Sequence, residues 1–169
     1  MIDTVRIFTF SLWFVLSVST VWACEVQPLF SPTDRVDDAI HAQLQHASKS
    51  VHCSLYGITN LRLANDLIAV KKRGVDVGVG LDKIQAAGKH DLHNKLQAVG
   101  ILIEIKPVAT LEHNKFCVLD GAIVIMGSWN WSNSAQKQDN SDVIITDCPN
   151  VGQAFEAAYQ RIIERDRPQ

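Results

Sequence analysis

The chain has 169 residues, of which 47% are apolar and 20% charged, with 16 basic and 18 acidic residues for a formal net charge of −2. This composition is globular and excludes a disordered or low-complexity chain. The length suits one domain with its own core, and because no global basic field exists, any anion-binding site must be local.

The longest apolar run lies at the N-terminus, which excludes a multispan membrane protein. Arg6 precedes this run, and Val21-Trp22-Ala23 offers a cleavage site, so residues 1–23 resemble a secretory signal peptide. The alternatives are an uncleaved anchor helix and a lipoprotein acylated on Cys24, which Trp22 disfavours. We expect a mature domain over 24–169 that is exported, to the periplasm or beyond, or is held at the membrane by its N-terminus.

Helix and strand patterns alternate along the first half of this domain. Thr33 is expected to cap a helix with apolar residues at 36, 40, 44 and 47, and a strand follows at 51–56. Asn60 is expected to start a helix that Gly74 ends, before a strand at 75–81.

The second half is richer in strands. A helix over 90–99 and a strand over 101–105 come first, and Asp120-Gly121 between apolar runs at 116–119 and 122–126 is a strong hairpin signal. A strand over 143–146 and a helix over 151–165 close the chain. The pattern predicts one α/β domain with a mixed sheet and helices on both faces.

The cysteines form an even set: Cys24, Cys53, Cys117 and Cys148. In an oxidising compartment they allow one or two disulfides, and the sequence does not choose the pairing. The alternative for Cys53 and Cys117 is that they are buried as small apolar residues in strands. The absence of a CxxC pair argues against a zinc knuckle or a thioredoxin-like site.

The most informative stretch is 113–132, HNKFCVLDGAIVIMGSWNWS. His113 and Lys115 share one face of a strand, and the hairpin brings Ser128 and Asn130 back towards them. Lys115 can hold phosphate oxygens by charge, Ser128 and Asn130 by neutral hydrogen bonds, and His113 can act as nucleophile or general acid. This set of groups suits a phosphodiester.

The run His113-x-Lys115-x4-Asp120-x6-Gly127-Ser128-x-Asn130 resembles the HKD signature of the phospholipase D superfamily. Upstream stretches at 29–32, 54–59 and 73–83 resemble its single-HKD subfamily, which contains small exported bacterial endonucleases and the mitochondrial cardiolipin hydrolase. The likeness covers 28–165 and implies a phospholipase D-like fold.

The resemblance also implies a mechanism. His113 forms a phosphohistidine, a second histidine protonates the leaving oxygen, Lys115, Ser128 and Asn130 hold the phosphate, and no metal or other cofactor is needed. Asp120 belongs to the catalytic signature, although its role in the family is mainly structural. Because this chain has one HKD motif, the resemblance implies a homodimer with a shared active site on its two-fold axis.

One position departs from the family pattern. A Glu that orients the histidine is expected where this chain has Ser141, and Asp142 stands where the family has Asn. Asp139 or Asp142 could replace that Glu, or the site could be weakened.

Several interpretations remain open from sequence. Trp129 and Trp131 can contact substrate or fill the core, and Tyr56 can line the groove or pack inside. The motif suits an exported endonuclease acting on DNA or RNA, a phospholipase D or cardiolipin hydrolase, or a non-catalytic nucleic-acid-binding homologue.

Overall fold

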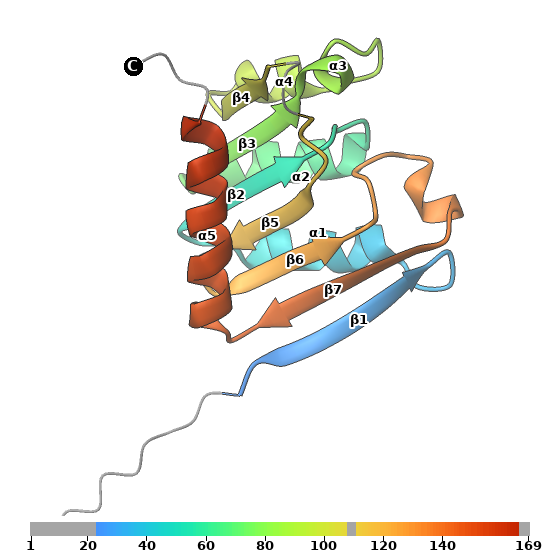
Figure 1. Cartoon of the computed structure of the whole chain (residues 1–169), viewed down its shortest axis with the longest axis vertical. Coiled ribbons are helices and arrows are strands. Elements are labelled where there is room, and N and C mark those ends of the chain that lie inside the picture. The colour runs from blue at the N-terminus through green and yellow to red at the C-terminus, as the bar shows by residue number, and fades with distance from the viewer. Residues whose placement is uncertain (1–22, 108–110, 166–169) are drawn as a thin grey trace, which may run out of the picture.

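The computed structural model describes residues 23–107 and 111–165, which form a seven-stranded mixed sheet in the order β1-β7-β6-β5-β2-β3-β4. The strands are β1 (Glu25–Ser31), β2 (Ser50–Leu55), β3 (Asp76–Asp82), β4 (Leu102–Lys106), β5 (Lys115–Leu119), β6 (Ile123–Gly127) and β7 (Asn140–Thr146). The helices are α1 (Val36–His46), α2 (Leu61–Lys72), α3 (Lys83–Ala86), α4 (His93–Gln97) and α5 (Pro149–Glu164). Figure 1 shows α1 and α2 behind the sheet and α5 in front of it. The predicted α/β architecture is therefore confirmed.

The N-terminal part of the domain differs from the sequence prediction. β1 is an edge strand that pairs with β7 and leaves its first four residues exposed, so it carries no alternating apolar pattern. The expected cap at Thr33 is wrong, because α1 begins at Val36 and no side chain caps it. Asp34 instead accepts a hydrogen bond from the Phe30 N–H at 2.7 Å and closes the turn after β1.

Two apolar clusters hold the helices to the sheet. The larger one joins the sheet to α1 and α2 and includes Val36, Ile40, Leu44, Leu63, Leu67 and Val70. The smaller one lies under α5 and contains Phe116, Val118, Tyr159 and Ile163. A Cβ at Gly78 would collide with the Tyr159 hydroxyl, so this strand glycine makes room for α5. At the start of α2, the predicted cap is confirmed, because Asn60 Oδ1 accepts from the Leu63 N–H at 3.2 Å.

The predicted hairpin between β5 and β6 turns at Asp120 and Gly121, which both have left-handed backbones with φ of 53° and 70°. The Asp120 carboxylate accepts hydrogen bonds from the N–H groups of Ser48, Lys49 and Ser50, with shortest distances of 2.9, 2.7 and 3.0 Å, and from the Ser48 hydroxyl at 2.9 Å. This carboxylate therefore ties the hairpin to the loop that leads into β2.

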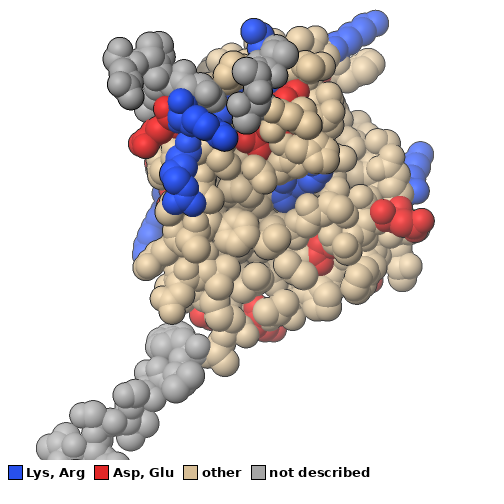
Figure 2. All heavy atoms as spheres, viewed as in Figure 1, with Lys and Arg blue, Asp and Glu red and all other residues tan. Residues whose placement is uncertain are grey.

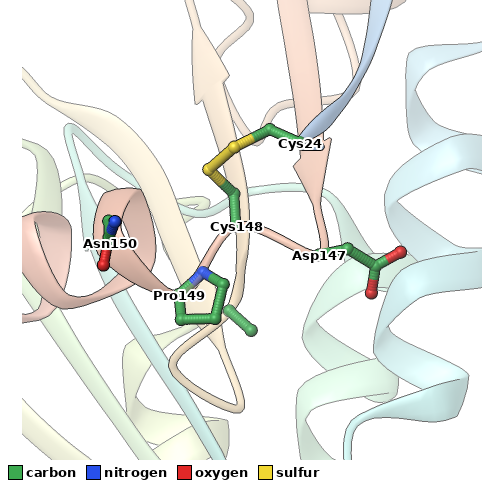
Figure 3. A pocket seen from close by; sticks show the side chains of 6 residues that line it. Cys24, Asp147, Cys148, Pro149 and Asn150 are labelled. Carbon is green, nitrogen blue, oxygen red and sulfur yellow. A yellow bond between two sulfur atoms is a disulfide. The ribbon is translucent and has the colours of Figure 1, made fainter. Parts of the chain in front are cut away.

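The four cysteines pair in two disulfides. Cys53 and Cys117 lie directly opposite each other on β2 and β5 and are fully buried, so they are at once core residues and a covalent link. Cys24 bonds to Cys148 and joins the start of β1 to the turn before α5 (Figure 3). A cavity of about 430 Å³ lies beside this second bond. The sulfur that acylation of Cys24 would require is used in the disulfide, so the two states exclude each other.

The expected signal peptide at 1–22 lies outside the described residues, and only Ala23 of that segment falls within them. Across residues 23–107 and 111–165, no helix has the length and apolar character needed to span a bilayer.

Candidate active site

Four chain segments meet at one edge of the sheet. β2 and β6 end there, while β5 and β7 begin there, because β5 runs antiparallel to β2 and β6, and β7 runs antiparallel to β6. The register sets Lys115 opposite Leu55 and Gly127 opposite Asp142. The segments that carry His113, Lys115, Ser128 and Asn130 therefore converge at this edge.

Tyr56 contacts both His113 and Lys115 of the motif. Its ring centroid lies 4.8 Å from that of the His113 imidazole, in an edge-on arrangement, and 5.0 Å from Lys115 Nζ. The Lys115 ammonium also donates a 2.6 Å hydrogen bond to the His113 carbonyl oxygen. Tyr56 therefore lines the candidate site and does not pack in the core, which were the two possibilities left open by the sequence.

Lys115 is partly withdrawn from water. Burial lowers the pKa of its ammonium, and the nearby Glu112 carboxylate opposes that shift only in part. Glu112 is 3% exposed and accepts from the Asn114 N–H at 3.0 Å and from its Nδ2 at 2.7 Å. A poorly solvated cation attracts a phosphate more strongly than an exposed one. The sequence reasoning missed Glu112, although an acidic residue directly before His-x-Lys was a usable signal.

Ser128 and Asn130 lie on the segment that follows β6. The Ser128 hydroxyl accepts from the Ser141 N–H at 3.0 Å, and the Ser128 N–H donates to the Ser141 carbonyl at 3.0 Å. The carbonyl of Trp131 accepts from the N–H groups of residues 59 and 60, both at 2.9 Å, which fastens this segment to the loop after β2. Asn130 is half-buried, and its Oδ1 has no hydrogen-bond partner among the described residues.

The two tryptophans of the motif belong to the core. Trp129 is 1% exposed and Trp131 is 2% exposed, and both pack into the larger apolar cluster. Direct stacking on a substrate is therefore not their role in this structure.

The Asp142 carboxylate holds the Ser128–Asn130 segment by a hydrogen bond. Its Oδ1 accepts from the Trp129 N–H at 3.2 Å, and a Cβ at Gly127 would overlap this oxygen, so glycine is required where β6 and β7 approach. Burial raises the pKa of Asp142 to about 6, while hydrogen bonds from the N–H groups of Trp129 and Ser128 limit the rise.

None of the three residues considered as replacements for the histidine-orienting Glu has a described contact with His113. Asp142 is directed at the Trp129 N–H, Asp139 is exposed, and Ser141 engages Ser128 through its backbone. Among the described residues, the ring packed against His113 is that of Tyr56.

Asp120 lies outside this cluster. It follows the far end of β5, roughly 15 Å along the strand from Lys115. Its hydrogen bonds to the loop before β2 give it a structural role.

Two cavities flank the Ser128–Asn130 segment. One of about 240 Å³ reaches Asn130 and Tyr56, and another of about 460 Å³ reaches Ser128 and Ser141. On the face shown in Figure 2, basic side chains gather near one end of α5 and are otherwise isolated, so no basic track crosses this face. The described residues contain no group of three or more His, Cys, Asp or Glu side chains placed to hold a metal ion.

Comparison with known proteins gives a consistent result. The family model described as "Cardiolipin synthase, PLD-like domain" matches residues 40–163. A phospholipase D of Rickettsia conorii is 27% identical over 139 residues, covering 82% of this chain and 70% of that protein. The mitochondrial cardiolipin hydrolase of Xenopus laevis is 26% identical over 153 residues, covering 85% and 73%.

Solved structures show the same fold. Nuc from Salmonella typhimurium, described as a phospholipase D family member, superposes with a TM-score of 0.80 at 24% identity, covering 86% of this chain and 97% of that chain. NucT from Helicobacter pylori gives a TM-score of 0.76 at 19% identity, covering 84% and 97%.

Proposed function

Because the chain belongs to the phospholipase D superfamily of phosphodiester hydrolases, we propose that it is an exported, metal-independent endonuclease that cleaves DNA or RNA through a phosphohistidine. The observation that carries this proposal is that the His113 imidazole and the Lys115 ammonium both lie against the ring of Tyr56. They do so at the edge of the sheet where β6 ends and the segment with Ser128 and Asn130 begins. These groups supply a nucleophile, a cation and neutral hydrogen-bond donors for one phosphate.

In the proposed first step, a ring nitrogen of His113 forms a bond to phosphorus and the bond from phosphorus to the leaving oxygen breaks. A protonated imidazole gives its proton to that oxygen. In the second step, the neutral imidazole takes a proton from water, whose oxygen attacks phosphorus and releases His113. Lys115, Ser128 and Asn130 stabilise the charge on the non-bridging oxygens in both steps.

The second imidazole is the reason to propose a homodimer. The chain carries one HKD motif, and no other histidine ring has a described contact with His113. A two-fold axis beside the sheet edge would bring the partner subunit's His113 to the same phosphate.

Export is supported by the sequence of residues 1–23 and by the two disulfides, since such bonds persist in oxidising compartments. A second candidate function is phospholipid cleavage, because curated relatives are named phospholipase D and cardiolipin hydrolase. The same chemistry would serve either substrate.

The test uses the purified mature chain with its disulfides intact, in excess EDTA, on single- and double-stranded DNA, RNA and cardiolipin vesicles. We expect cleavage of nucleic acid that His113→Ala abolishes, with His90→Ala, an exposed histidine, as the matched control. Turnover of lipid alone would favour the second candidate. An inactive dimer that still binds nucleic acid, equally well with His113→Asn, would indicate a non-catalytic homologue.

A further inference from the structure

A small cavity of about 240 Å³ lies beside the phosphate-binding groups, between the loop after β2, the start of α3 and the segment after β6. We call it the neutral cavity. The side chains that line it are Tyr56, Thr59, Gln85, Asn130, Ser132 and Ser134. Because Tyr56 and Asn130 also belong to the site, an occupant of the neutral cavity would lie next to the proposed phosphate position.

The lining of the neutral cavity is polar but uncharged. Gln85 Nε2 donates to the Tyr56 hydroxyl at 2.9 Å, and the hydroxyls of Ser132 and Ser134 lie 3.2 Å apart. Oδ1 of Asn130 has no partner among the described residues and is shielded from solvent. These groups offer both donors and acceptors, but no charge that would hold a cationic headgroup or a second phosphate.

The cavity on the other side of Ser128 is less suited to recognition. The Nδ2 of Asn140 already donates to Ser31 Oγ at 3.3 Å and to two backbone carbonyls, and the lining includes the acidic Asp139. The Asn140 carboxamide therefore has no N–H left to donate to an occupant of that cavity.

We propose that the neutral cavity binds the nucleoside on one side of the scissile phosphate, an inference that rests on the proposed function. Carboxamides such as those of Gln85 and Asn130 are the side chains that pair with base edges, and unstacked bases are read in this way. The cavity is smaller than the roughly 300–1,000 Å³ typical of drug-sized ligands, which fits a single base or sugar. An acyl chain in this cavity would leave the carboxamide and hydroxyl groups of the lining without hydrogen-bond partners.

The test compares three chromogenic phosphodiesters with the same p-nitrophenolate leaving group. They carry thymidine (as the 5′ or 3′ ester), glycerol or a second nitrophenyl group on the retained side. The variant is Thr59→Val with Ser132→Ala, which removes two hydroxyls at nearly constant shape. Thr146→Val, the same exchange at the far end of β7, is the matched control.

We expect wild type and Thr146→Val to prefer a thymidine ester. The double variant should lose about tenfold in kcat/KM on that ester, as for two neutral hydrogen bonds, and stay within about twofold on bis(p-nitrophenyl) phosphate. Equal losses on all esters, or an unchanged preference, would overturn the inference while the proposed hydrolase stands. A preference for the glycerol ester would overturn it in favour of a lipid headgroup. No turnover by wild type on any ester would overturn the proposed function and this inference with it.

Discussion

The carboxylate of Asp120 offers the most direct test of how the fold supports the site. It accepts hydrogen bonds from three consecutive backbone N–H groups and one hydroxyl, which belong to the end of the loop before β2 and to the first residue of β2. Hydrogen bonds to a charged group are worth about 1.5–3 kcal/mol each. Ser48 and Lys49 are exposed, so water replaces part of the loss. We therefore expect Asp120→Ala to lower the free energy of unfolding by about 3 kcal/mol, including strain at φ 53°.

Asp147 provides the matched control. It also has a left-handed backbone, with φ 54°, but no described hydrogen bond to its carboxylate. Asp147→Ala should therefore report the strain alone, about 1 kcal/mol. Asp120→Asn keeps one acceptor oxygen and tolerates the left-handed region, so it should lie between the control and Asp120→Ala.

The assay is urea denaturation with disulfides intact, read as a shift of the midpoint at unchanged slope. Although burial acts to raise it, the pKa of Asp120 is lowered by hydrogen bonds from Lys49, Ser50 and Ser48. A lowered pKa gives stability that is present above the unfolded value, about 3.9, and is lost as pH falls through the folded value. The gap between wild type and Asp120→Ala should therefore close in acid. An Asp120→Ala protein as stable as wild type, or folded but unable to cleave, would refute the structural role.

Two further substitutions test the site itself. Asp142→Asn should raise stability above pH 6 by about 2 kcal/mol, because the raised pKa of about 6 makes wild type lose stability as pH rises through that value. Thermal unfolding from pH 4 to 8 measures this, and a parallel pH dependence in both proteins would contradict it. Tyr56→Phe keeps the ring against His113 and Lys115, so kcat should stay within about threefold, whereas Tyr56→Ala should lose tenfold or more. Equal effects of both exchanges would show that the ring does not position these groups.

Sequence reasoning succeeds where contacts are local. The hairpin at Asp120-Gly121 and the cap at Asn60 are each set by a few adjacent residues, and both are as predicted. It fails where a contact joins distant segments. β1 forms because its backbone pairs with that of β7. Tyr56 contacts His113 although more than fifty residues separate them in the sequence.

The position of Asp142 shows the same limit in the site. The family pattern suggested Asp139 or Asp142 as a substitute for the orienting Glu, but the register between β6 and β7 turns the Asp142 carboxylate towards Trp129. A shift of one residue would reverse that direction, and only the pairing of the strands fixes it.

The same division separates the groups proposed to act on the phosphate from those proposed to set substrate preference. The groups proposed to act on phosphate come from one hairpin and the residues that flank it, so their spacing can be recognised in the sequence. Thr59 and Gln85, which line the neutral cavity, instead follow the carboxyl ends of the parallel strands β2 and β3, where ligand sites of open sheets commonly lie. These loops can change without disturbing the hairpin. Relatives with one fold can therefore be named for different substrates, and exchanging loop residues here should alter substrate preference while cleavage of a generic phosphodiester persists.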